Sequence, residues 1–350
     1  MVAVPERVAG EPGTVRVTVV SDGLMATPSP GTGGLQSVVY DLCCGLADSG
    51  VDVTLIAAQG SRCPRAKVVE TVMPNLGNLV GSEAANAEAA LNTNYDVLLD
   101  ISHTHKAAYV DITKSVIFHQ DVGPIAPHPR VYCISFSQGQ RTCQWKDTPY
   151  KVVVIHNRVY NPPSVPEVER RDVALFMGNI VRHKGAHIAI EVAERAGYPL
   201  WIAGVPHEPV YAEVVLNECL KGRATYIGAL KGMEKWRVLA RVRMVICCAN
   251  RGYTGYNETA QLVAMEAALM GTPVLGSMNG GLHEYVAEAT GHCGKNIAEM
   301  VAAAPAVWGM DHDAVRAYAL QNFTLESVMP RWVALLEGVA GESGASPDAI

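Results

Sequence analysis

Residues 257–276 of this 350-residue chain read Asn-Glu-Thr-Ala-Gln-Leu-Val-Ala-Met-Glu-Ala-Ala-Leu-Met-Gly-Thr-Pro-Val-Leu-Gly, and residues 279–284 follow as Asn-Gly-Gly-Leu-His-Glu. This pattern predicts a loop, a helix, a tight turn, a buried strand and a glycine loop. Gly271 suits the left-handed position after a last helical turn, and Thr272-Pro273 prevents continuation. Because the helix is apolar on most sides, we expect it to lie buried against a sheet.

Two carboxylates on this apolar helix need an explanation, because buried charges are rare unless something pairs with them. Glu258 and Glu266 are eight positions apart, which is about 12 Å along a helix axis. They could therefore bind the two ends of an elongated ligand. Glu258 also falls at the helix N-terminus, where free backbone N–H groups commonly bind phosphate. An acid favoured by the helix dipole plus one solvated glutamate explains the spacing equally well.

Length and composition describe an ordinary globular chain with room for two domains. It is 49% hydrophobic and 18% charged. No apolar run approaches the roughly 20 residues that cross a membrane. The first seven residues lack the basic and apolar regions of a signal peptide. We therefore expect a cytoplasmic protein without a transmembrane segment.

Charge and cysteine content exclude several classes of partner. The net charge of −6 argues against a nucleic-acid backbone as the main partner. No block of lysine and arginine indicates an anionic membrane surface, although a weak peripheral membrane contact stays open. The nine cysteines contain no Cys-x-x-Cys pair, and several lie in apolar runs. Small buried thiols are therefore expected, rather than disulfides or a zinc site.

The N-terminal half opens with a strand, a glycine loop, a helix and a second strand, which is how a dinucleotide-type α/β fold begins. The loop does not spell G-x-G-x-x-G, because Gln36 occupies the last slot, so a plain turn is as good an explanation. Further short apolar strands predict a parallel sheet covered on both faces. The expected elements are Thr14–Val20, Leu35–Ser49, Val51–Ala57, Val97–Asp100, Ser115–His119, Val131–Ser135 and Val152–Ile155.

Polar side chains follow two of these strands, where ligands of parallel sheets bind. They are Asp100, Ser102, His103 and His105 after one strand, and His119 and Asp121 after the next. For any one of the histidines a structural role is the commoner explanation. A metal site is less expected, because no carboxylate or cysteine joins them at ligand spacing.

The C-terminal half repeats this alternation after a proline-rich, charged linker. Its expected elements are Val173–Met177, Lys184–Ala196, Leu200–Ala203, Tyr211–Leu220, Ala224–Ile227, Met233–Arg241, Met244–Cys247, Arg316–Asn322 and Leu325–Leu336. The predicted organisation is an N-terminal domain at 14–160, a linker at 161–171, a C-terminal domain at 172–315, closing helices at 316–340 and a disordered tail at 341–350.

Six motifs, in the order and spacing of one family, run through residues 15 to 335. They are Gly33-Gly34 with Gly50-Val51-Asp52-Val53-Thr54, then Tyr95-Asp96-Val97, Val154 to Val159, Phe176 to Gly185, Glu258 with Glu266, and Gly271 to Glu284. They are similar to "GG…GHEVTV", "fDvvH", "vIpNGVD", "flGRlvpeKG", E-x7-E and "GtPVva…GGlxE". The chain thus resembles the retaining, GT-B-fold glycosyltransferases of family 4.

This resemblance implies two Rossmann-like domains with parallel sheets facing a cleft. The sugar-nucleotide donor would bind the C-terminal domain and the acceptor the N-terminal one. Glu258 would hold the donor sugar, Glu266 the ribose and Lys184 the leaving diphosphate. The remaining implied contacts are the backbone near Ala260 and Gln261, the glycine loop at Gly33 and Gly34, and the loop around Leu230 at the base. Carboxylates are strong acceptors for paired hydroxyls, which gives the E-x7-E spacing a rationale.

The implied reaction moves a sugar to an acceptor hydroxyl with retention, giving an α-glycoside. The donor would be a UDP-, GDP- or dTDP-type sugar, and the acceptor a natural product, a glycan, a lipid or a protein. The resemblance implies no cofactor and no metal, because Lys184 and a helix N-terminus would stabilise the departing diphosphate electrostatically. A leaving phosphate oxygen can accept the acceptor's proton, so no separate base is required.

The chain departs from the family at both walls of the implied cleft. Asn179 stands where the family has arginine, and Arg182 in the same loop is a candidate replacement. Leu99 and Ile101 stand where the family has histidines, which makes His103 a stand-in for the catalytic-face histidine. These departures leave two alternatives open: a GT-B sugar-nucleotide epimerase or hydrolase, and a catalytically inactive sugar-nucleotide-binding protein.

Overall fold

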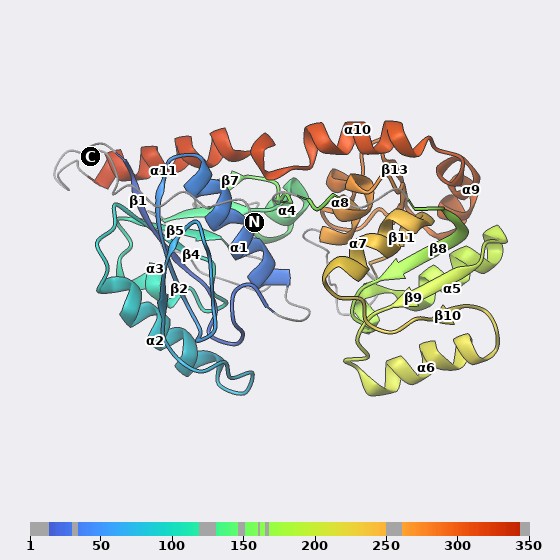
Figure 1. Cartoon of the computed structure of the whole chain (residues 1–350), viewed down its shortest axis with the longest axis horizontal. Helices are drawn as coiled ribbons and strands as arrows, with labels where there is room; N and C mark the ends of the chain where they lie inside the picture. Colours follow the sequence, from blue (N-terminus) through green and yellow to red (C-terminus); the bar gives the residue numbers. More distant parts are fainter. Residues whose placement is uncertain are drawn as a thin grey trace.

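The computed structural model describes residues 14–29, 34–118, 131–145, 151–159, 162–164, 168–249 and 261–343. Within these ranges the strands form two parallel sheets, one from each half of the chain (Figure 1). The predicted α/β class with two Rossmann-like sheets is therefore confirmed. Several residues that the sequence singles out lie outside the described ranges: Gly33, His119, Asp121, Glu258 and Ala260.

The first sheet has seven strands in the order β3-β2-β1-β4-β5-β6-β7. Neighbouring residues of a strand point to opposite faces, so both faces carry apolar side chains. Val19 faces the core that α1 and the C-terminal helix cover, whereas Val20 faces the core that α2 covers. The elements are β1 (Arg16–Val20), α1 (Gly34–Asp48), β2 (Asp52–Ala57), β3 (Lys67–Glu70), α2 (Leu79–Leu91), β4 (Val97–Asp100), α3 (Lys106–Val110), β5 (Ser115–Phe118), β6 (Tyr132–Ser135), α4 (Gln138–Trp145) and β7 (Lys151–Val154).

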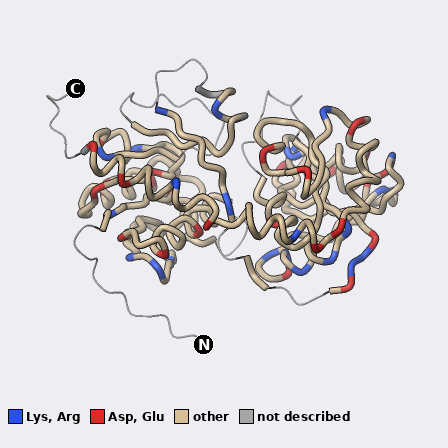
Figure 2. The backbone as a smooth tube through the Cα atoms, turned by 90° about the horizontal axis from the view of Figure 1, so that it is seen from above, with Lys and Arg blue, Asp and Glu red and all other residues tan. Residues whose placement is uncertain are grey.

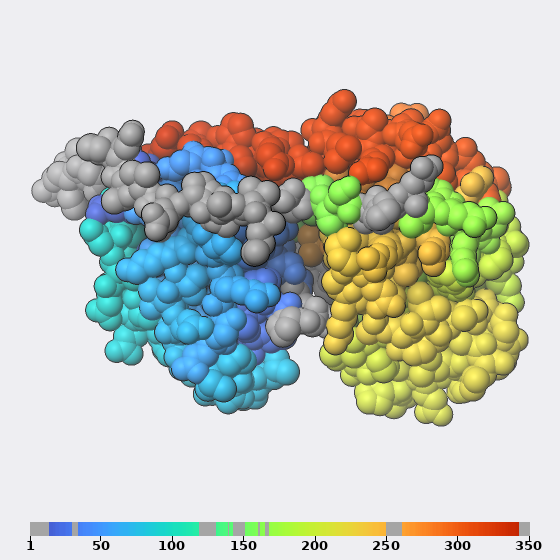
Figure 3. All heavy atoms as spheres, in the orientation of Figure 1, coloured from blue at the N-terminus to red at the C-terminus, as the bar shows by residue number. Residues whose placement is uncertain are grey.

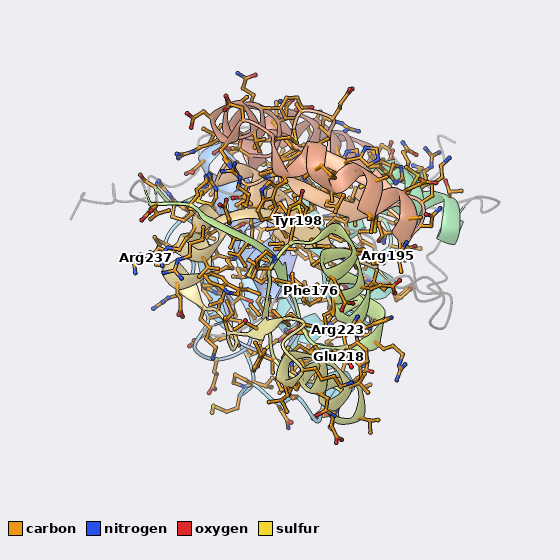
Figure 4. The ribbon with its side chains drawn as sticks, turned by 90° about the vertical axis from the view of Figure 1, so that its right-hand side faces the viewer. Phe176, Arg195, Tyr198, Glu218, Arg223 and Arg237 are labelled. Atoms are coloured by element: carbon orange, nitrogen blue, oxygen red, sulfur yellow. The ribbon has the colours of Figure 1, made fainter. Side chains whose placement is uncertain are left out.

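The second sheet has six strands in the order β10-β9-β8-β11-β12-β13. Leu175 of β8 faces the core formed with α7 and α8, and its neighbour Phe176 faces the core formed with α5 and α9. At the outer end of the latter core the ring of Tyr198 (Figure 4) stacks on Trp308. The elements are β8 (Arg171–Met177), the 3-10 turn η1 (Arg182–Lys184), α5 (Ala186–Ala196), β9 (Leu200–Ala203), α6 (Pro209–Leu220), β10 (Thr225–Tyr226), α7 (Gly232–Arg241), β11 (Val242–Cys247), α8 (Leu262–Leu269), β12 (Val274–Ser277), η2 (Leu282–Tyr285), β13 (Gly291–Gly294) and α9 (Ile297–Trp308).

The C-terminal segment crosses from the second sheet back to the first, as the red helices of Figure 1 show. Its α10 (His312–Asn322) packs in the core of the second sheet, and η3 (Leu325–Ser327) with α11 (Met329–Ser343) packs in the core of the first. Trp332 of α11 is 2% exposed and lies edge-on to Phe118 of β5, with 5.1 Å between the ring centroids. This segment therefore joins the two domains by hydrophobic burial.

A second link between the domains lies beside the glycine motif of the opening stretch. The Tyr285 hydroxyl donates to the Phe136 carbonyl at 2.6 Å and accepts from the Asn157 N–H at 3.1 Å. Its neighbour Glu284 accepts the Gln138 N–H at 2.8 Å, and its Oε2 lies 2.9 Å from His156 Nε2. Residues of the C-terminal domain thus fix the ends of β6 and β7 in the N-terminal domain.

The helix of the opening stretch begins later than the sequence predicts. Gln261 has an extended backbone, with φ −105° and ψ 104°, and its Nε2 donates to the Cys248 carbonyl at 3.4 Å. Gln261 is the N-cap of α8, which begins at Leu262. The prediction of one continuous helix from Glu258 to Glu266 is therefore wrong, and the spacing of about 12 Å inferred from helical rise does not apply. The left-handed conformation expected of Gly271 is confirmed, with φ 76°.

The structure also differs from the sequence predictions in where one helix starts and in two elements that no sequence pattern indicated. Lys184 ends the turn η1 rather than starting a helix, and α5 begins at Ala186. The sequence did not predict α9, which contains Pro305, nor β13, a four-residue strand with glycine at both ends. Proline disfavours a helix interior and glycine weakens a strand, but here packing against the rest of the second sheet outweighs these local preferences.

The described residues can be compared with the sequence predictions about membrane spans, cysteines and metal sites. None of the described helices combines the length and apolarity needed to cross a bilayer. All cysteines whose side chains are described are free thiols, and most are buried, as predicted. Among the same residues, no three histidine, cysteine or acidic side chains gather in a way that could hold a metal ion.

Candidate active site

A cavity of about 400 Å³ lies between the two domains, where Figure 3 shows the surface hollowed between the two lobes. The N-terminal domain lines it with the start of α1 and with residues that follow β6 and β7. The C-terminal domain lines it with the ends of β8 and β9, the loop before α7 and the start of α8. Both sheets thus present the carboxyl ends of their strands, which is where α/β proteins bind ligands.

Two helix N-termini open into this cavity, one from each domain. Gly34 and Leu35 at the start of α1 line one side, and Leu262 and Val263 at the start of α8 line the other. Neither helix has an acidic residue in its first turn, and no side chain caps α8 at Gln261. Unsatisfied N–H groups and the positive end of the dipole make such a place suitable for an anion.

The charged side chains that line the cavity favour the same kind of ligand. Among the described residues they are Lys184, Lys231, Lys235 and Glu266, which carry three positive charges and one negative charge. The whole chain has a net charge of −6, and its charges are interspersed over both domains (Figure 2). A local excess of positive charge in an acidic protein therefore indicates an anionic ligand.

The backbone that carries Lys184 is fixed from α6. The Tyr211 hydroxyl accepts the His187 N–H at 3.1 Å and lies 2.7 Å from His187 Nδ1. Burial of this pair lowers the pKa of His187 and raises the pKa of Tyr211. Both side chains therefore stay uncharged near neutral pH, and the hydrogen bonds that hold the loop persist there.

The structure separates the two residues considered for the missing arginine. Asn179 lines the cavity next to Gly178. The guanidinium of Arg182 instead lies over the ring of Tyr211, 5.3 Å from its centroid, and Arg182 is not among the described residues that line the cavity. The role proposed for Arg182 from the sequence is thus not supported by its position.

Glu266 lies on α8, lines the cavity and is 12% exposed. Its Oε1 lies 2.5 Å from the ammonium nitrogen of Lys235 on α7. Lys235 belongs to none of the six sequence motifs. One signal was available: Lys231 and Lys235 flank the start of α7, where the helix dipole disfavours positive charge.

Several residues named from the sequence meet in this cavity, and the others are placed elsewhere. The structure brings Gly34, Asn179, Lys184, Leu230, Gln261 and Glu266 together on its walls. Leu230, in the loop before α7, and Phe176 of β8 (Figure 4) add apolar surface to the cavity. Ala260 and two other expected contacts, Gly33 and Glu258, lie outside the described residues.

His103 lies in the N-terminal domain, beyond the described lining of the cavity. Its Nε2 is 3.7 Å from Oδ2 of the buried Asp22, which accepts a hydrogen bond from Gln36 Nε2 at 2.6 Å. Asp22 and His103 follow β1 and β4, where the strand order of the sheet reverses. Such a switch point is a common ligand site, so His103 remains a candidate for the acceptor side.

His105 has the structural role that is expected of most histidines at such positions. It is 1% exposed, and its Nδ1 lies 3.7 Å from Oδ1 of the fully buried Asp100. Burial alone would raise the pKa of Asp100, but the interactions with His105, Ser102 and the Ala108 N–H outweigh it and lower that pKa. This network anchors the turn that carries His103.

Replacing Glu83 with glutamine should loosen the His103 loop. Glu83 is 1% exposed, and its two oxygens accept the N–H groups of His103 and Thr104, both at 2.7 Å. An amide NH₂ would face one of these donors, so we expect a loss of about 1–3 kcal/mol in the free energy of unfolding. Urea denaturation measures it, with the exposed Glu88→Gln on the same helix as control; equal stability of the two variants would contradict the assignment.

The comparison with known families agrees with this geometry. Residues 160–304 match the family described as "Glycosyl transferases group 1". The C-terminal half of the chain is a group 1 glycosyltransferase domain. The chain as a whole has the GT-B architecture, and this domain marks it as a nucleotide-sugar-dependent glycosyltransferase. No curated protein sequence matches the chain significantly.

Solved GT-B glycosyltransferases match almost the whole chain. AviGT4, a glycosyltransferase involved in avilamycin A biosynthesis, is 25% identical with a TM-score of 0.74 over 93% of this chain and 98% of its own. Anabaena HepE, solved with UDP and glucose, is 15% identical with a TM-score of 0.68 over 93% and 100%. The pneumococcal O-GlcNAc transferase GtfA, solved with UDP and GlcNAc, is 9% identical with a TM-score of 0.64 over 94% and 99%.

Proposed function

We propose that this glycosyltransferase moves a sugar from a nucleotide-diphosphate sugar to an acceptor hydroxyl with retention, without a metal ion. The observation that carries this proposal is that two helix N-termini, Lys184 and the Glu266 carboxylate all line one cavity. The helix N-termini and Lys184 suit a diphosphate, and the Glu266 carboxylate suits the hydroxyls of a ribose. The family model and the GT-B neighbours support the donor class.

Each end of the donor has a proposed partner. The diphosphate would lie between the starts of α1 and α8, within reach of Lys184, and the ribose hydroxyls would donate to Glu266. The base would lie along the loop at Leu230. Glu258, Ala260 and Gly33 keep the roles that the sequence suggests, with Glu258 at the donor sugar. HepE and GtfA were solved with UDP, so UDP-sugars are the first donors to test.

The chemistry requires one bond to break and one to form on the same face of the sugar. The bond between the anomeric carbon and the β-phosphate oxygen breaks, and the acceptor oxygen forms the new bond. The acceptor proton passes to the leaving phosphate oxygen. Negative charge grows on the diphosphate, and fixed N–H dipoles and Lys184 stabilise it. His103 and Asp22 would lie on the acceptor side.

Incubation with UDP-glucose, UDP-GlcNAc and GDP-mannose, with and without acceptor candidates, tests this proposal. Acceptor-dependent nucleotide release with an α-linked product supports it. Acceptor-independent release would favour a hydrolase, and tight binding without turnover would favour a binding protein. The hydroxyl acceptor and the cytoplasmic location stay predictions from the sequence.

Chelation of divalent cations should leave the initial rate unchanged. The helix N-termini and Lys184 supply at the diphosphate the charge that magnesium supplies in many other phosphoryl sites. The rate is measured with EDTA and again with added magnesium or manganese. A rate that disappears with EDTA and returns with metal would overturn the metal-free mechanism.

A further inference from the structure

The ion pair between Lys235 and Glu266 lies inside the cavity and connects two elements that are distant in sequence. The ammonium group of Lys235 lies 2.5 Å from Glu266 Oε1 and 4.6 Å from the ring centroid of Trp236. The two side chains are 27% and 12% exposed. Lys235 is therefore held from two sides and has little freedom to leave the carboxylate.

We propose that Lys235 is a positioning residue for recognition of the donor's ribose. This inference rests on the proposed function, in which Glu266 accepts hydrogen bonds from the ribose hydroxyls. Lys235 keeps one oxygen of Glu266 fixed, so the carboxylate meets the 2′- and 3′-hydroxyls in a single orientation. A preoriented acceptor binds more tightly because less side-chain freedom is lost on binding.

The place of Lys235 in the fold explains why this pairing could set specificity. It lies on α7, directly after the loop that carries Leu230 and Lys231 along the cavity. Glu266 lies on α8, whose first turn opens toward the proposed diphosphate site. The ion pair thus links the base side of the cavity to the ribose side. A nucleotide without the 2′-hydroxyl loses one of the bonds that this arrangement provides.

A simpler role for Lys235 is a general attraction for the diphosphate, and Lys231 offers a matched comparison. Lys231 lines the same cavity and carries the same charge, four residues earlier. Lys231→Met and Lys235→Met each remove one positive charge there. A purely electrostatic role predicts equal weakening of ribo- and deoxyribonucleotides in both variants. A positioning role predicts a change in their ratio for Lys235→Met alone.

The test is calorimetric binding of UDP and 2′-deoxy-UDP to the full chain, with GDP and 2′-deoxy-GDP if UDP does not bind. We expect the wild-type protein to prefer the ribonucleotide by about 10- to 100-fold, as for one lost charge-assisted hydrogen bond. Lys235→Met should bring this ratio close to one. Lys231→Met should weaken both ligands and keep the ratio. Lys235→Arg should restore it, which also shows that the site still folds.

Three other outcomes would overturn the inference, and each one points to a different explanation. A wild-type ratio preserved in Lys235→Met shows that Glu266 needs no positioning. Equal losses for both nucleotides in both lysine variants assign Lys235 to the diphosphate. A wild-type protein that binds both nucleotides equally, or binds neither pair, refutes the ribose or donor assignment of the proposed function itself.

Discussion

Replacing Lys184 with alanine is expected to lower kcat by about 100- to 1,000-fold, as for the loss of one preorganised charge-stabilising group. Lys184 ends the turn η1 and lines the cavity, and its loop is held by Tyr211 through His187. Its charge is therefore already in place when the diphosphate departs. Because charge grows mainly in the transition state, kcat should fall more than KM rises.

Arg182→Ala is the matched comparison for Lys184→Ala, because both cations belong to the same turn. The Arg182 guanidinium lies over Tyr211 rather than in the cavity, so we expect a much smaller loss of kcat. Unchanged thermal unfolding of both variants would show that the fold is intact. Near wild-type turnover in Lys184→Ala would refute the site. A loss in Arg182→Ala as large as in Lys184→Ala would restore Arg182 as the replacement for the family arginine.

The parts of the fold that the sequence predicted well are those with a strong local pattern. Residues 97–100 and 200–203 were predicted to the residue, since each is a short apolar run that becomes fully or nearly buried in a parallel sheet. By contrast, α9 contains Pro305 and β13 is bounded by glycines. Their conformations depend on packing against the second sheet, which no local pattern records.

The residues of the candidate site likewise divide into those that sequence motifs contain and those whose contacts depend on the tertiary structure. The motifs contain Lys184, Gln261 and Glu266, and the structure brings these three residues to the walls of one cavity. The pairing of Lys235 with Glu266 joins residues 31 positions apart on different helices. No motif contains both of them. Likewise, the position of Arg182 over Tyr211 depends on α6, a tertiary neighbour, so sequence spacing suggested a role that its position does not support.

Gly204→Ala is expected to destabilise the C-terminal domain by about 3 kcal/mol or more, through overpacking and backbone strain together. Gly204 follows β9 with φ 156°, and an added Cβ would lie 1.8 Å from the carbonyl oxygen of Gly178. That oxygen belongs to the backbone after β8, so the clash cannot be relieved by rotating a side chain. Gly178 and Gly204 both line the cavity, so the ends of β8 and β9 must separate at the donor site.

Gly197→Ala separates strain from clash in this experiment. Gly197 also has a positive φ, 78°, but nothing lies within 4 Å of its Cβ position. We expect it to cost about 1–2 kcal/mol, the usual cost of a left-handed residue with a Cβ. Denaturant unfolding gives both values, and UDP affinity is measured on the folded protein. If Gly204→Ala costs no more than Gly197→Ala and binds UDP as the wild type does, the close contact at Gly178 does not shape the donor site. A larger loss of stability together with weaker UDP binding shows that the two strand ends must touch for the cavity to hold its ligand.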